Sequence, residues 1–114
     1  MYFISYDLGT GGVKASLYDR DFTSLAKCFI EYPTYYPADG WHEQRPEDWW
    51  RSVCRSTHML LSQTGVDNRE IACVALSGHS LVTVPIDEGN RFCLIKSPSG
   101  LTAERPRRQT SSFR

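Results

Sequence analysis

The sequence predicts an α/β protein built on a mixed sheet, with its elements in the order β-β-β-α-β-β. Three observations support this fold class. Three runs with strand-like patterning open the chain and are separated by short turns. One amphipathic segment at helical spacing follows, between Pro46 and Gly65. A short continuous apolar run comes next, which is typical of a strand with parallel neighbours. The connection between the meander and that run requires a crossover, and helices then cover a face of the sheet.

The three N-terminal strands are predicted from short-range patterns. Residues 2–6 are rich in aromatic and β-branched side chains and predict a buried strand that ends at Asp7. Residues 13–17 alternate apolar and polar side chains, which is the period of a strand. The glycine-rich stretch 9–12 separates the two, so a hairpin joins them. Residues 25–32 are the third candidate, and the short turns predict an antiparallel meander.

The second half of the chain contains one helix and two further strand candidates. Pro46 suits the first turn of a helix, Glu47 and Asp48 suit its positive end, and Gly65 suits its C-terminus. Residues 71–76 predict a strand buried on both faces, residues 81–86 one more strand, and residues 87–90 a turn. The apolar stripe of the helix consists of Trp49, Val53, Cys54, Thr57, Leu60 and Leu61.

Composition restricts the classes of protein that need to be considered. The chain has 114 residues, enough for one small domain or a piece of a larger one, and its 13 basic and 13 acidic residues balance. This balance argues against a nucleic-acid or anionic-membrane surface. No apolar run approaches the ~18 residues of a membrane span, and no signal-peptide pattern is present. The four cysteines lack metal-site spacing, so we expect buried free thiols and a cytoplasmic protein.

The stretch from Asp7 to Lys14, DLGTGGVK, is the first candidate for chemistry. Backbone N–H groups in a glycine-rich turn converge on phosphate oxygens when no Cβ blocks the approach. Thr10 adds a hydroxyl, Lys14 adds a positive charge, and Asp7 suits Mg²⁺ held through water. An ordinary glycine-rich hairpin with a surface carboxylate explains the same residues equally well, so both interpretations stay open.

Two further stretches suit a polyol ligand. In GWHEQRPEDWW, residues 40–50, Trp41 lies beside Glu43 and Gln44, and an aromatic face with a carboxylate and an amide suits stacking and hydroxyl recognition. In SGHS, residues 77–80, polar side chains follow a predicted parallel strand, where open α/β sheets place ligands. His79 suits a substrate hydroxyl, although a histidine satisfied within a turn is the commoner case.

Taken in order, these three stretches resemble the N-terminal end of the FGGY carbohydrate kinases, the family of xylulokinase, ribulokinase and glycerol kinase. The resemblance covers residues 2–90 and rests on DLGTGGVK, GWHEQRPEDWW and IACVALSGHSLVTVPIDEGN. It implies the N-terminal portion of an actin-like, ribonuclease-H-like ATPase domain. It also implies ATP-dependent phosphorylation of a sugar or polyol with Mg²⁺.

The resemblance also implies roles for individual residues. The nucleotide phosphates would contact Thr10, Gly11, Gly12 and Lys14, with Asp7 beside Mg²⁺. Ser80 and Leu81 occupy the two positions that touch substrate in relatives, which often carry Met-His or Arg-Glu there. His79, just before them, is expected to take over, which leaves the identity of the sugar open. The general base of the family lies beyond residue 114, so this chain alone is expected to be inactive and to self-associate through exposed sheet edges.

The last residues, 91–114, depart from the family pattern and form an aberrant or disordered basic tail. Shifting the frame by one base near residues 92–96 allows residues 96–113 to be recoded as IPIWSDSRAAETPDEFFQ. That string resembles the W-x-D-x-R continuation of the family, so a frameshift is one hypothesis. One alternative is a non-enzymatic interaction module that uses the tail as a basic arm and the tryptophans as a partner surface. A less favoured one is an actin-like chaperone or cell-shape ATPase.

Overall fold

The computed structural model describes residues 1–80 and 82–92. The expectations for Leu81 and for residues 93–114 lie outside the described part of the chain. The described residues divide into two compact units, one of residues 1–33 with 46–80 and one of residues 34–45 with 82–92.

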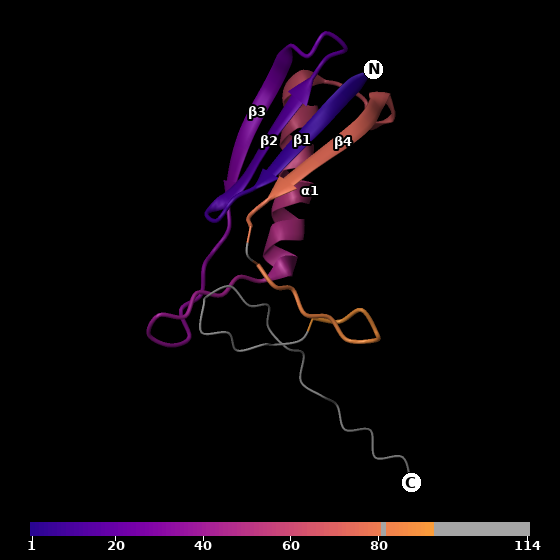
Figure 1. Cartoon of the computed structure of the whole chain (residues 1–114). Coiled ribbons are helices and arrows are strands. Elements are labelled where there is room, and N and C mark those ends of the chain that lie inside the picture. The colour runs from indigo at the N-terminus through magenta and orange to yellow at the C-terminus, as the bar shows by residue number, and fades with distance from the viewer. Residues whose placement is uncertain (81, 93–114) are drawn as a thin grey trace. The chain divides into compact units, whose positions relative to one another are not determined.

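The first unit is a four-stranded mixed sheet with one long helix on one face (Figure 1). The strands are β1 (Tyr2–Leu8), β2 (Gly12–Tyr18), β3 (Ser24–Glu31) and β4 (Ile71–Gly78), and their order in the sheet is β3-β2-β1-β4. β1 pairs antiparallel with β2, and β2 pairs antiparallel with β3, which confirms the predicted meander. β4 pairs parallel with β1, which confirms the predicted crossover.

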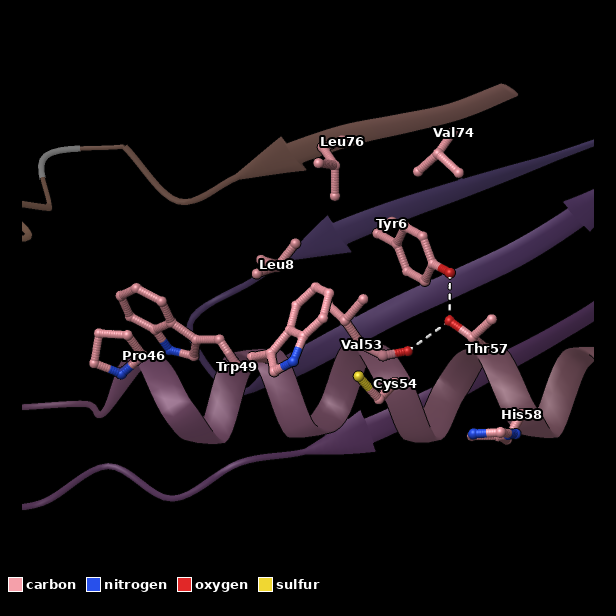
Figure 2. Close-up of a pocket in the computed structure, with 11 residues that line it drawn as sticks. Tyr6, Leu8, Pro46, Trp49, Val53, Cys54, Thr57, His58, Val74 and Leu76 are labelled. Carbon is pink, nitrogen blue, oxygen red and sulfur yellow. Dashed lines mark hydrogen bonds between the residues drawn. The ribbon is translucent and has the colours of Figure 1, made fainter. Parts of the chain in front are cut away.

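Helix α1 spans Pro46–Thr64, between the proline and the glycine that predicted its ends. Gly65 adopts a φ of 71°, the left-handed conformation that favours glycine, and its N–H donates to the Leu61 carbonyl at 2.8 Å. The Thr57 hydroxyl donates to the Val53 carbonyl at 2.7 Å, so it accepts from the Tyr6 hydroxyl, 2.5 Å away (Figure 2). Burial raises the pKa of Tyr6, which keeps this donor protonated.

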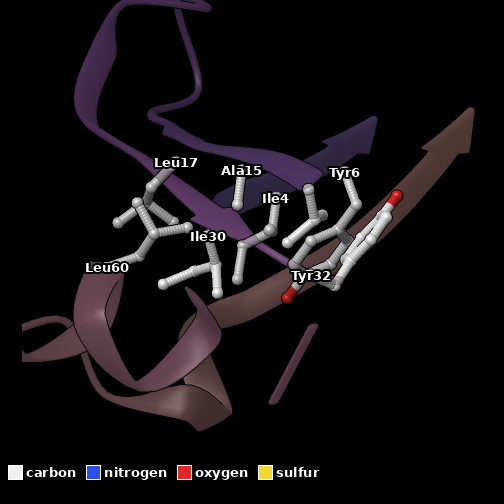
Figure 3. Close-up of a cluster of buried hydrophobic side chains, with 8 residues drawn as sticks. Ile4, Tyr6, Ala15, Leu17, Ile30, Tyr32 and Leu60 are labelled. Atoms are coloured by element: carbon white, nitrogen blue, oxygen red, sulfur yellow. The ribbon is translucent and has the colours of Figure 1, made fainter. Parts of the chain in front are cut away.

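The hydrophobic core lies between the sheet and α1 (Figure 3). The alternation predicted for residues 13–17 is confirmed, because Val13, Ala15 and Leu17 of β2 are buried there whereas Lys14 is exposed. In β1, Ile4 and Tyr6 are buried on the same face. Leu60 is the hydrophobic side chain of α1 that is fully buried in this core, and Ser56 of α1 is fully buried as well. The core consists of Ile4, Tyr6, Val13, Ala15, Leu17, Ile30, Tyr32 and Leu60.

Three expectations were wrong. β4 was predicted to be buried on both faces, but residues 72–78 are exposed, because β4 is an edge strand and α1 packs chiefly over β2 and β3. Residues 82–86 were predicted to complete a strand, but they contain only isolated bridge residues, and Pro85 cannot donate to a strand ladder. Cys73 was expected to be buried and is exposed on β4.

The described residues of the second unit, 34–45 and 82–92, form turns and isolated bridges. The turn predicted at residues 87–90 is confirmed, since the Asn90 N–H donates to the Asp87 carbonyl at 2.9 Å. Hydrogen bonds from the Arg91 and Gly89 N–H groups, with the Arg91 charge, lower the pKa of Asp87. Phe92 forms an antiparallel bridge with Ile86. Within the described part of the chain, no helix combines the length and apolar character needed to cross a membrane.

Candidate phosphate and metal site

A polar row crosses the sheet near the end of β1. Asp7 is paired with Lys14 of β2 on one side and with Ser77 of β4 on the other. Tyr6 and Leu8, the neighbours of Asp7 in the chain, face α1, so Asp7 and its two partners face the opposite side of the sheet. The Ser77 hydroxyl donates to Asp7 Oδ1 at 3.0 Å. The fold therefore places one carboxylate and one ammonium group side by side on an exposed surface.

The glycine-rich hairpin extends this row beyond the sheet. The Gly9 N–H donates to the Gly12 carbonyl at 3.0 Å, which closes a tight turn with Thr10 and Gly11 at its tip. Thr10 and Gly11 are exposed, whereas Gly12 is buried. A Cβ on Gly12 would lie 2.5 Å from the Ile30 carbonyl oxygen, so packing against β3 requires glycine there. A Cβ on Gly11 would meet nothing within 4 Å, so packing within the chain does not explain the glycine at the tip.

Tyr32 anchors the hairpin, and sequence reasoning missed this residue. Its hydroxyl donates to the Gly9 carbonyl, and its N–H donates to the Gly11 carbonyl at 3.3 Å. Burial, with a smaller contribution from the Asp7 charge, raises the pKa of Tyr32 to about 12. The only signal in the sequence was an aromatic residue at the end of the third strand, which does not specify a partner 23 positions away.

His79 is held at the end of β1 by two hydrogen bonds. Its N–H and its Nδ1 both contact the Leu8 carbonyl oxygen, at 3.0 Å and 2.7 Å. The ring is half-buried and lies edge-to-face with Trp49 of α1, with 5.3 Å between the ring centroids. Nε2 is buried and has no hydrogen-bond partner among the described residues.

The structure brings some of the predicted site residues together and leaves others apart. Asp7 and Lys14 share one row, and the exposed tip with Thr10 and Gly11 follows directly from it. His79 reaches the end of β1 through Leu8, but its ring packs on the α1 side, whereas Asp7 faces the other side of the sheet. Ser80 is exposed after β4, and Leu81 lies outside the described residues.

The loop residues expected to face a polyol lie in the second unit. Gln44 is only 2% exposed, and its Nε2 donates to the Thr34 hydroxyl at 2.9 Å. Glu43 forms an antiparallel bridge with Tyr35, whose ring also lies 4.3 Å from the Arg45 guanidinium carbon. The Gln44 amide therefore already has a partner within the loop, and this weakens its assignment to a ligand.

An apolar groove of about 610 Å³ runs between α1 and the exposed strand β4 (Figure 2). None of the predicted phosphate, metal or substrate residues lines it. Its walls are almost entirely hydrophobic, so it does not suit an anion. It is lined by Tyr6, Leu8, Pro46, Trp49, Trp50, Val53, Cys54, Thr57, His58, Val74 and Leu76.

The polar row and the hairpin tip suit a phosphate with a divalent cation. Among residues 1–80 and 82–92, no group of three or more His, Cys, Asp or Glu side chains is placed to hold a metal ion alone. Mg²⁺ does not need such a cage, because it keeps several waters and is bound through one or two carboxylates together with substrate phosphates. The exposed carboxylate of Asp7, oriented by Ser77, fits that requirement.

Comparison with known proteins identifies the family. Residues 2–96 match the N-terminal domain of the FGGY family of carbohydrate kinases. The chain is 36% identical over 93 residues to a glycerol kinase from Marinomonas sp. (strain MWYL1), covering 77% of this chain but only 18% of that kinase. It is also 34% identical over 83 residues to a glycerol kinase from Afipia carboxidovorans, covering 73% of this chain and 17% of that kinase.

A solved structure agrees with this assignment. The crystal structure of a xyloylose kinase from Brucella ovis superposes with a TM-score of 0.76 at 27% identity, covering 81% of this chain and 19% of that one. The fold is thus the N-terminal portion of the actin-like ATPase fold of the sugar kinases, as the sequence predicted. The chain belongs to the FGGY family of carbohydrate kinases and contains part of its N-terminal domain.

Proposed function

We propose that this chain supplies the phosphate- and Mg²⁺-binding hairpin of a kinase that transfers a phosphoryl group from ATP to a hydroxyl of a sugar or polyol. The observation that carries this proposal is the exposed row of Asp7 and Lys14 beside a hairpin tip whose Gly11 leaves room for a ligand. The family match, the glycerol kinase relatives and the xyloylose kinase structure support the reaction class.

The residues of the hairpin suit the charge that develops during phosphoryl transfer. Catalysis of this reaction consists mainly of positioning and of electrostatic stabilisation of the phosphoryl oxygens. Lys14 would reach one of these oxygens as a point charge, while Thr10, Gly11 and Gly12 line the approach with a hydroxyl and backbone. Mg²⁺, when bound at Asp7, would neutralise phosphate charge. The Ser77 hydroxyl keeps the Asp7 carboxylate oriented.

We propose that the acceptor hydroxyl binds at the same end of the sheet as the hairpin, but on the side that faces α1. We propose that His79, Ser80 and Leu81 contact the sugar or polyol, as their positions after β4 suggest. The parallel pair of β1 and β4 ends with Leu8 opposite Gly78, so the segment after Gly78 lies beside the start of the hairpin.

The chain is proposed to bind nucleotide without completing the reaction. It spans less than a fifth of the length of the glycerol kinases that it matches. The general base that removes the proton from the acceptor hydroxyl is expected outside this chain. A glycerol kinase from Plasmodium falciparum, solved with ADP, shares the fold at a TM-score of 0.63 and 18% identity, which supports ATP as the donor. We place the activity in the cytoplasm, where ATP and reduced cysteines coexist.

Nucleotide binding tests the proposal directly. Titration of the ¹⁵N-labelled chain with MgATP is expected to shift the backbone amides of residues 9–14 and to leave those of residues 24–28 on β3 in place. ATP with EDTA should produce smaller shifts, because the metal contribution at Asp7 is removed. Unchanged hairpin amides at millimolar MgATP would exclude the proposal. If inorganic sulfate shifts the same amides as much as MgATP does, the hairpin binds anions without selectivity for a nucleotide.

We propose that residues 1–90 form the kinase portion and that residues 91–114 follow from a frameshift. The family match extends to residue 96, close to the proposed shift. The nucleotide sequence tests this, because only codons that encode the alternative string in the next frame are compatible with it. The basic arm of the rival function, a non-enzymatic interaction module, lies outside the described part of the chain.

We also propose that isolated chains associate through β4. The strand contains no charged residue and no proline, and its Val74 and Leu76 side chains are 51% and 69% exposed. Natural edge strands usually carry charges, prolines or bulges that prevent pairing with another chain. The opposite edge, β3, carries Lys27 and Glu31. Pairing between two copies is therefore expected at β4 and not at β3.

A further inference from the structure

We infer that His79 is a hydrogen-bond acceptor, through Nε2, for a hydroxyl of the bound polyol, and that the Leu8 carbonyl fixes the tautomer that makes it one. This inference deepens the proposed function, on which it rests for the class of ligand. It assigns a direction to the hydrogen bond, from ligand to protein, which no comparison supplies.

The geometry of the Leu8 carbonyl determines the tautomer. A carbonyl oxygen can only accept a hydrogen bond, and His79 Nδ1 lies 2.7 Å from it. Nδ1 therefore carries a proton. In the neutral ring the other nitrogen, Nε2, then has a lone pair and no proton, so it can only accept.

The orientation of the ring is fixed by its surroundings. The N–H of His79 donates to the same Leu8 oxygen at 3.0 Å, so the backbone and the ring are tied to one atom at the end of β1. Trp49 of α1 packs edge-to-face against the ring, at 76° between the ring planes. Neither contact uses Nε2, which is buried and has no hydrogen-bond partner among the described residues.

A buried acceptor without a donor is rare in native proteins and indicates a missing partner. The partner must donate, so a hydroxyl group fits, whereas a phosphate or carboxylate oxygen presents a lone pair to a lone pair. His79 follows β4 directly, where the register places it beyond the Leu8 and Gly78 pair and beside the glycine hairpin. A hydroxyl bound at Nε2 would lie at the same end of the sheet as the hairpin, on the side that faces α1.

Nuclear magnetic resonance tests the tautomer and the direction of the hydrogen bond together. Long-range ¹H–¹⁵N correlation on the labelled 114-residue chain, which has 3 histidines, resolves the two ring nitrogens, and the spectrum of His79→Asn assigns His79. The expected result is a protonated Nδ1 with an unprotonated Nε2. Glycerol should shift the Nε2 resonance, and 1,2,3-trimethoxypropane, which keeps the oxygens but has no hydroxyl donor, should not.

Two substitutions separate the ligand contact from a structural role. In His79→Asn the side-chain amide can still donate to Leu8 but does not reach the Nε2 position, whereas in His79→Gln the longer amide reaches it with a carbonyl acceptor. We expect His79→Asn to weaken glycerol binding about tenfold, the equivalent of one hydrogen bond, and His79→Gln to retain most of it. His58→Asn, an exposed histidine of α1, serves as the control.

Several results would overturn the inference. A protonated Nε2, or a ring protonated on both nitrogens, contradicts the tautomer assignment. Equal shifts with glycerol and its trimethyl ether, no shift with glycerol, or equal losses in the Asn and Gln variants contradict the acceptor role. If MgATP still shifts the hairpin amides in these cases, the proposed kinase function stands and only the His79 assignment fails. If neither ligand produces a shift, both fail.

Discussion

The Ser77 hydroxyl donates a hydrogen bond of 3.0 Å to Asp7 Oδ1, across 70 positions of sequence. The contact exists because β4 pairs parallel with β1 and places these residues in the same row, where Lys14 of β2 also lies. A carboxylate that would otherwise rotate freely at the surface is held in one orientation next to the glycine hairpin. The hydrogen bond thus connects the first and the third of the sequence motifs, DLGTGGVK and IACVALSGHSLVTVPIDEGN.

The first prediction concerns the carboxylate. Asp7→Asn is expected to weaken MgATP binding about tenfold, because the neutral amide removes one charged interaction with the metal. Ser77→Ala should have a smaller effect of about twofold to threefold, since it removes only the orienting hydrogen bond. Isothermal titration calorimetry measures both. Equal affinities in wild type and Asp7→Asn would show that Asp7 is an ordinary surface residue.

The second prediction distinguishes two glycines of the hairpin. Gly12→Ala should lower the free energy of unfolding by roughly 1–3 kcal/mol, because its Cβ would lie 2.5 Å from the Ile30 carbonyl oxygen. Gly11→Ala should change it by less than about 0.5 kcal/mol, because nothing lies within 4 Å of the added Cβ. Urea denaturation provides both values.

The same pair of variants tests the phosphate site. Gly11→Ala should weaken nucleotide binding although the fold is retained, since the new methyl group occupies the approach to the tip. Normal MgATP binding by a folded Gly11→Ala variant would argue that phosphate does not approach at this point.

The third prediction concerns the phenol of Tyr32. Its pKa is raised from 10.0 to about 12 by burial and, to a smaller extent, by the Asp7 charge. Asp7→Asn should therefore lower the pKa of Tyr32, although burial should keep it above its ordinary value. An NMR titration of the Tyr32 ring measures the change, and an unaltered pKa would place Asp7 too far away to act on it.

The sign of the effect on stability follows from the raised pKa. Below pH 10 the Tyr32 phenol is protonated in the folded and unfolded states, and its contribution is fully present. Between about pH 10 and 12 the unfolded chain loses this proton first, so stability falls as the pH rises. Tyr32→Phe should show a shallower decline in this range when unfolding by urea is measured at several pH values.

The fourth prediction concerns the edge strand. Leu76→Lys should convert a dimer into a monomer, because a charge at a 69% exposed edge position opposes pairing between strands. Leu25→Lys, at a 43% exposed position on β3, should leave the dimer intact. Sedimentation velocity over a range of concentrations measures the molar mass. A monomeric wild type, or equal dissociation in both variants, would contradict association through β4.

Much of the first unit could be predicted from the sequence because its signals are local. The alternation of Val13, Ala15 and Leu17 determined which face of β2 is buried, and Pro46 and Gly65 marked the ends of α1. The motif around Asp7 and the order of the three stretches were sufficient for the family. The strand expected over residues 81–86 failed for a local reason as well, since Pro85 interrupts the described part of it.

The sequence by itself therefore determined the order of the first elements, the hairpin and the family. Only the tertiary structure decided that β4 is exposed, that Tyr32 anchors the hairpin through Gly9, and that Leu8 sets the tautomer of His79. Strand and helix patterns repeat over a few residues and can be recognised locally. Which residues meet across the sheet depends on strand order and register, which arise only when distant segments pair.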